Sequence, residues 1–137
     1  MKRVLCFGTF DGLHPGHEDF MRQARGQGDY LTVVVARDAT TEQVKGHRPQ
    51  QSEEERLAAV RTVRYVDEAQ LGGVGDKYAV IEELKPDVIV LGYDQEAFTD
   101  GLAQTLEDRE FSCDIFRAYA FHPEQFKTSL MRVKGKE

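Results

Sequence analysis

The sequence has little of what a membrane, nucleic-acid-binding or disulfide-stabilised protein needs. It carries 18 basic against 24 acidic residues, a formal net charge of −6, whereas binding to a polyphosphate backbone needs a basic surface. No apolar run approaches the roughly 20 residues that span a bilayer, and the one after Met1-Lys2-Arg3 is too short for a signal peptide. The two cysteines, Cys6 and Cys113, lie in apolar runs without CxxC spacing, which predicts buried, reduced thiols. We therefore expect a cytoplasmic protein with neither a nucleic-acid nor a membrane partner.

What the sequence does contain is an alternation of apolar strands and amphipathic helices. Its 137 residues, 40% hydrophobic and 31% charged, suit a single domain over residues 1–137. The pattern predicts strands at 2–7, 30–36, 65–69, 87–91 and around 113–116. It predicts helices at 16–25, from 52 to about 63, between Asp76 and Pro86, through 102–106 and from about 128. Such alternation is typical of an α/β fold, a Rossmann-like, doubly wound, parallel five-stranded sheet with helices on both faces.

Two strand ends differ from plain turns, and one connection is long. In an open parallel sheet, ligands bind at the carboxyl ends of the strands. Residues 8–17 and 92–95 follow the first and fourth strands, so the predicted fold brings them to the same edge. Residues 37–51 are polar and without periodicity, which predicts a long functional loop.

The first of these strand ends combines glycine with two histidines. Gly8 allows a ligand to approach the backbone closely, and His14 and His17, three residues apart, open the following helix. A helix N-terminus favours negative charge, so the arrangement suits a polyphosphate and the charge that develops during phosphoryl-group chemistry. The alternatives are a capping histidine beside a surface histidine, or a zinc pair, for which the nearby sequence offers no third ligand.

These residues also carry a resemblance. Gly8-Thr9-Phe10-Asp11 followed by His14-Pro15-Gly16-His17 resembles the signature of the cytidylyltransferase-like nucleotidyltransferases, the HxGH superfamily, and the similarity covers nearly the whole chain. Residues 64–68 (RYVDE) resemble glycerol-3-phosphate cytidylyltransferases. However, Gly92-Tyr93-Asp94-Gln95 departs from the GDDW of those enzymes, and their RTEGISTT segment is missing. With residues 35–38 and Lys127-Thr128-Ser129, this segment is more similar to archaeal-type FAD synthases, which adenylylate FMN.

The resemblance implies a set of site residues. It assigns catalysis to His14, His17 and Lys45. It assigns contacts with the acceptor or its phosphate to Lys45, Arg64 and Lys127. The nucleotide contacts are Thr9, Phe10, Asp11, His14, Pro15, Gly16, His17, Asp94, Gln95, Tyr119, Thr128 and Ser129. Three of these assignments have structural alternatives: a solvated loop lysine for Lys45, a salt bridge for Arg64, and core or interface packing for Tyr119.

The expected reaction is direct in-line attack by an acceptor phosphate on the α-phosphorus of an NTP. No residue looks like an activated nucleophile, and Mg²⁺ is expected to bridge the triphosphate with mostly phosphate and water ligands, so no protein metal site is predicted. The leading hypothesis is FMN plus ATP giving FAD and pyrophosphate, with Phe98, Tyr119, Phe121 and Phe126 either walling the flavin or packing in the core. The alternatives are a cytidylyltransferase acting on CTP and glycerol 3-phosphate or another small phosphate ester, and a non-catalytic nucleotide-binding module. Related enzymes suggest a homodimer.

Overall fold

The computed structural model describes residues 1–73, 78–93 and 102–120. The strands there are β1 (Arg3–Gly8), β2 (Tyr30–Val35), β3 (Glu68–Leu71), β4 (Val88–Leu91) and β5 (Asp114–Arg117). The helices are α1 (Pro15–Arg25), α2 (Asp38–Lys45), α3 (Glu53–Arg61), α4 (Ala79–Leu84) and α5 (Leu102–Asp108). Among these residues, no helix is both long and apolar enough to cross a bilayer.

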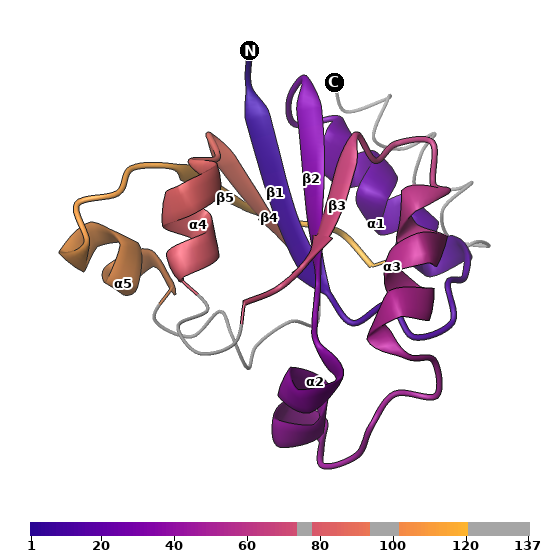
Figure 1. Cartoon of the computed structure of the whole chain (residues 1–137). Helices are drawn as coiled ribbons and strands as arrows, with labels where there is room; N and C mark the ends of the chain where they lie inside the picture. Colours follow the sequence, from indigo (N-terminus) through magenta and orange to yellow (C-terminus); the bar gives the residue numbers. More distant parts are fainter. Residues whose placement is uncertain (74–77, 94–101, 121–137) are drawn as a thin grey trace.

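The strands form one parallel sheet in the order β3-β2-β1-β4-β5 (Figure 1). The chain winds outward from β1 to one edge and then from β4 to the other, so the strand order reverses between β1 and β4. The register sets Cys6 beside both Val33 and Val90. The turn after β1 and Gly92, which follows β4, therefore lie at the same edge of the sheet. The predicted doubly wound, parallel five-stranded sheet is confirmed.

Helices cover both faces of the sheet, with α1 and α3 on one side and α4 and α5 on the other (Figure 1). Successive residues of a strand point to opposite faces, which is why Val4 and Cys6 pack under α1 and α3 while Leu5 packs under α4 and α5. The inner strands are apolar on both faces because neither face meets water. This packing holds the ends of β1, β2 and β4 rigidly.

Residues 37–51, predicted to be a loop, contain the helix α2. It lies beyond the carboxyl ends of the strands, apart from both helix layers (Figure 1), and Thr41 is its buried residue. A helix that buries one side chain has no apolar stripe, so its sequence shows no period. Its end is marked instead by Gly46, which adopts a left-handed φ of 83° and caps the last turn.

Two smaller predictions were also wrong. β3 begins later than predicted, because Asp67 still lies outside the strand and closes a pair of hydrogen bonds with Leu31. Cys6 is buried as predicted, and burial raises the pKa of its thiol, but Cys113 is only partly buried. The expected cap at Asp76 and the last helix from Thr128 lie outside the described residues.

Candidate active site

The turn after β1 is shaped by the side chain of Phe10. Its backbone has a φ of 55°, in the left-handed region, and its ring is buried. The ring folds back onto Gly8, where an added Cβ would lie 2.4 Å from the ring atom Cζ. Gly8 is therefore needed for space, and the strained Phe10 backbone is held by packing, as is common where a chain shapes a ligand site.

The two histidines converge at the start of α1. Their ring centroids lie 3.7 Å apart, and the ring planes are inclined by 21°. His14 is the N-cap of α1, and its Nδ1 accepts from the backbone N–H groups of Gly16 at 3.1 Å and His17 at 3.4 Å. The Phe10 and His17 rings make a T-shaped contact, with centroids 5.4 Å apart. The packing of Phe10 thus fixes the second imidazole, and the cap fixes the first.

The cap also decides which atom of His14 meets a ligand. Because Nδ1 accepts hydrogen bonds, it carries no proton, and in the neutral ring the N–H is at Nε2. The His14 side chain is exposed, so this N–H is a donor at the end of the helix. The capping role, which the sequence left as an alternative to ligand binding, is compatible with it because the two roles use different nitrogens. The amides of Gly16 and His17, by contrast, are directed at His14.

Asp11 links the turn between β1 and α1 (residues 9–14, called the motif turn below) to the connection between α2 and α3. Its carboxylate accepts from the backbone N–H groups of Gln50 at 2.8 Å and Gln51 at 3.0 Å. In return, the side-chain Oε1 of Gln51 accepts from the N–H of Gly12 at 2.9 Å. Both oxygens of Asp11 are thus used within the protein, which gives this predicted nucleotide ligand a structural role.

Arg56 on α3 was missed by the sequence analysis. Its side chain is fully buried, and Nη1 donates to the carbonyl oxygen of Thr9 at 2.8 Å. Nη2 forms an ion pair with Asp38 at 2.8 Å. The sequence held a signal, because Arg56 shares a helical face with the buried Val60 and Val63. A charged residue on an apolar face needs a buried partner.

Acid should weaken this region selectively. Backbone hydrogen bonds from Gln50 and Gln51 hold the pKa of Asp11 below its ordinary 3.8, and the hydrogen bond from Arg56 does the same for the pKa of Asp38. A lowered folded-state pKa contributes stability above the unfolded-state value, and that contribution is lost as the pH falls through the folded-state pKa. Urea unfolding of Asp11→Asn should show lower stability than the wild type at neutral pH and a shallower decline below pH 3.8. Equal declines for both proteins would contradict this role of Asp11.

A family model described as cytidylyltransferase-like matches residues 5–134. The chain belongs to the cytidylyltransferase-like family. The family fits the geometry of the turn, the histidine pair and the parallel sheet, and this chain is therefore a nucleotidyltransferase.

Several curated relatives of this nucleotidyltransferase are FAD synthases. The one from Aciduliprofundum boonei is 51% identical over 96 residues, which are 70% of this chain and 64% of that protein. The one from Archaeoglobus fulgidus is 45% identical over 82% of this chain and 81% of its own. The one from Ferroglobus placidus is 42% identical over 88% and 78%, respectively.

Solved structures share the fold. A protein from Thermoplasma volcanium described as a lipopolysaccharide core biosynthesis protein has a TM-score of 0.84 and 38% identity, over 89% of this chain and 99% of that one. A pantoate-beta-alanine ligase from Francisella tularensis has a TM-score of 0.63 at 14% identity, over 89% of this chain and 60% of its own, and so shows the fold alone.

In this nucleotidyltransferase, Lys45 lies at the same edge of the sheet as the histidines, the edge formed by the carboxyl ends of the strands. It is the last residue of α2 and is exposed, and its charge lies close enough to Asp11 to help lower the pKa of that carboxyl. The segment that carries it is tied at both ends, at Asp38 to α3 and at Gln50 to the motif turn.

Arg64 lies away from the histidines. It follows α3 and precedes β3, at the amino ends of the strands, whereas His14 lies at the carboxyl ends. Its guanidinium donates to the Tyr65 hydroxyl at 2.7 Å and lies over the Tyr65 ring. The structure therefore does not bring Arg64 to the predicted phosphate site.

Tyr119 is fastened to α1 through its backbone. Its N–H donates to Oε1 of Gln23 at 2.9 Å, and its carbonyl oxygen accepts from Nε2 of the same side chain at 3.0 Å. The tyrosine side chain is 75% exposed, so it is not a core residue. Pro15, another predicted contact, is the first residue of α1. Eight further predicted contacts and flavin-wall residues lie outside the described residues: Asp94, Gln95, Phe98, Phe121, Phe126, Lys127, Thr128 and Ser129.

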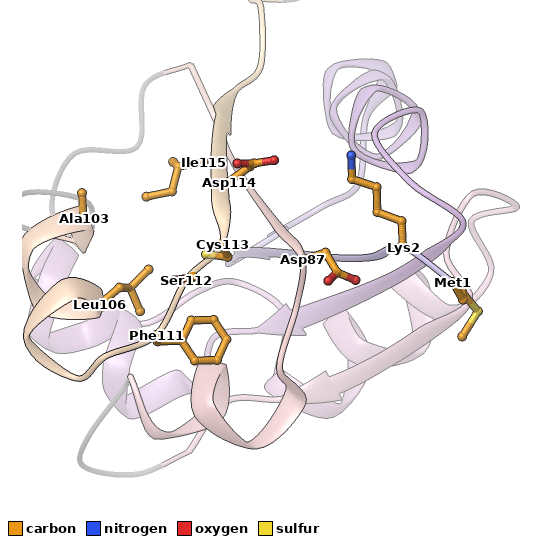
Figure 2. Close-up of a pocket in the computed structure, with 10 residues that line it drawn as sticks. All are labelled: Met1, Lys2, Asp87, Ala103, Leu106, Phe111, Ser112, Cys113, Asp114 and Ile115. Carbon is orange, nitrogen blue, oxygen red and sulfur yellow. The ribbon is translucent and has the colours of Figure 1, made fainter.

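A groove of about 740 Å³ lies at the opposite edge of the sheet, between the amino ends of the strands and α5 (Figure 2). Lys2 and Asp87, which immediately precede β1 and β4, and Asp114, the first residue of β5, line it together with Leu106 and Phe111. None of the predicted site residues that the structure describes lines this groove. It is separate from the histidine site.

Proposed function

We propose that this nucleotidyltransferase is an FMN adenylyltransferase, an FAD synthase that makes FAD and pyrophosphate from FMN and ATP. The observation that carries the proposal is its identity of 41–51% to several FAD synthases. The stacked pair of His14 and His17 supports it, because the pair sits where a parallel sheet binds ligands and offers the donors that a triphosphate needs.

In the proposed reaction, a phosphate oxygen of FMN attacks the α-phosphorus of ATP in line with the bond to the β-phosphate. The new P–O bond forms as the α–β bond breaks, and the bonding electrons leave with pyrophosphate. Nε2–H of His14 donates to a phosphate oxygen on which negative charge grows. Two backbone N–H groups donate to Nδ1 of the same ring, and such chained hydrogen bonds polarise one another. The backbone N–H groups at the N-terminus of α1 therefore polarise the imidazole ring, and this strengthens the hydrogen bond from Nε2–H to the phosphate.

In the proposal, Lys45 and Mg²⁺ neutralise the remaining negative charge of the triphosphate. In the proposal, α2 holds Lys45 beside the β- and γ-phosphates. Mg²⁺ enters as the Mg·ATP substrate complex, held mainly by phosphate oxygens and water. In the part of the chain that the structure describes, no three His, Cys, Asp or Glu residues gather as a metal site. Removing Mg²⁺ with EDTA should therefore stop turnover without unfolding the protein.

The homodimer and the cytoplasmic location are part of the proposal; the dimer rests on the resemblance to related enzymes, and the location on the two cysteines without disulfide or metal-ligand spacing. Light scattering coupled to size exclusion would test the dimer.

The assay for the proposal measures pyrophosphate release with Mg²⁺. It crosses ATP and CTP against FMN, glycerol 3-phosphate, phosphocholine and phosphoethanolamine, with each product confirmed by mass. FAD formed from ATP and FMN alone is the expected result. Turnover only with CTP and a small phosphate ester would replace FMN adenylylation with cytidylyl transfer, the function that residues 64–68 favour. Nucleotide binding without turnover in any pairing would favour a binding module.

A further inference from the structure

Arg56 links three segments that are far apart in the sequence. One guanidinium donates to the carbonyl oxygen of Thr9 in the motif turn, to the carbonyl oxygen of Gln51 between α2 and α3, and to the carboxylate of Asp38 at the start of α2. The distances are 2.8, 3.1 and 2.8 Å, in that order. The side chain has no solvent exposure, so it meets neither substrate nor water.

The arrangement suits a guanidinium and no other side chain. Arginine offers five N–H donors in a rigid plane, whereas lysine offers three on one compact centre. A lysine at this position would keep one charge beside Asp38. It would not reach the Thr9 and Gln51 carbonyl oxygens as well, and a buried acceptor left without a donor destabilises its surroundings.

The linked segments are the ones that carry the proposed triphosphate contacts. Thr9 begins the motif turn that leads through Phe10 to the histidines, and Asp38 begins the helix that ends at Lys45. Asp38 is also fixed by a reciprocal pair of hydrogen bonds with Glu53, each residue's N–H donating to the other's carboxylate. Arg56 therefore sets the distance between the turn and the base of α2 from inside the protein.

We propose that Arg56 is a positioning residue for the nucleotide: it holds the motif turn and α2 at the separation at which the turn, the histidines and Lys45 contact one triphosphate. The inference rests on the proposed function for the identity of the nucleotide. In the proposed reaction Lys45, at the end of α2, contacts the β- and γ-phosphates, so all three linked segments serve the nucleotide. The inference therefore predicts a defect in nucleotide binding rather than in acceptor binding.

The test compares Arg56→Lys with Arg61→Lys. Arg61 lies on the same helix, is exposed and donates to the carbonyl oxygen of Ala69, so its replacement controls for an Arg-to-Lys change on α3. For Arg56→Lys, we expect the KM for ATP to rise about tenfold, because a displaced motif turn or α2 would lose one charge-assisted hydrogen bond to the triphosphate. The KM for FMN should stay within about twofold. Arg61→Lys should change neither constant.

A merely structural role would give a different pattern. Loss of folded protein lowers the apparent kcat in proportion and leaves both KM values unchanged, and that result would overturn the proposal, as would equal effects of the two variants. If Arg56→Lys does not fold, the same comparison is made with Asp38→Asn, which keeps the donors to Thr9 and Gln51 and removes the ion pair. A rise in the KM for ATP is again expected, and unchanged KM values would again overturn the proposal.

A binding measurement separates this inference from the proposed function. Calorimetric titration with Mg·ATP and Mg·CTP needs no acceptor. If the wild type makes no FAD but binds a nucleotide that Arg56→Lys binds about tenfold more weakly, the positioning role stands and FMN adenylylation fails. If the wild type binds neither nucleotide, the positioning role fails as well.

Discussion

His14→Asn should lose most of its activity, by a factor between about 10² and 10³, the effect of removing one donor to a transition-state oxyanion. Its melting temperature should change little. The Oδ1 atom of asparagine is attached to Cγ, as Nδ1 of histidine is, and asparagine is among the best N-cap residues. The variant therefore keeps the cap on Gly16 and His17 while losing Nε2, the nitrogen assigned to the phosphate.

His14→Ala is the matched comparison. It loses the cap as well as Nε2, so it should be about 1 kcal/mol less stable than His14→Asn, with a similar loss of kcat. Pyrophosphate release and thermal unfolding, measured on both variants, separate the two functions of one ring. An active His14→Asn would show that His14 is only a cap. His17→Asn should lose activity as well, because the stacked pair acts on one triphosphate.

The sheet could be predicted because burial of its strands on both faces requires continuous apolar runs, which are visible in the sequence. In an alternating chain, a run such as Leu31–Val35, in which every residue is buried, has one explanation: a parallel strand covered on both faces. The same reasoning fails for α2, since Thr41 alone among its residues is buried. A helix held at its ends, through Asp38 and Gly46, leaves no periodic pattern.

The site was predictable in part for a related reason. The histidines were found because their chemistry is visible in residue type and spacing. The role of Arg56 depends on three acceptors, in Thr9, Asp38 and Gln51, that meet only in the folded chain. Arg64 was assigned to the phosphate site by resemblance, although a residue just before a strand lies at the amino ends of a parallel sheet, away from the histidines.

Gly8→Ala should disrupt the site through packing. The new Cβ would lie 2.4 to 2.9 Å from three atoms of the Phe10 ring, closer than any real contact. The ring cannot simply withdraw, because His17 makes a T-shaped contact with it and Phe20 stacks on it with centroids 6.3 Å apart. Overpacking of this kind costs about 1–3 kcal/mol. Movement of Phe10 would also displace His17, so kcat should fall together with stability.

Two other glycines separate this effect from backbone strain. Gly12 has a φ of +73° and nothing within 4 Å of an added Cβ, and Gly73 has open space without a positive φ. Gly12→Ala should therefore lose about 1 kcal/mol through strain alone, and Gly73→Ala should match the wild type in stability and kcat. Chemical denaturation and pyrophosphate release, run on all three variants, give the comparison. If Gly8→Ala behaves like Gly73→Ala, Phe10 does not hold His17 in place.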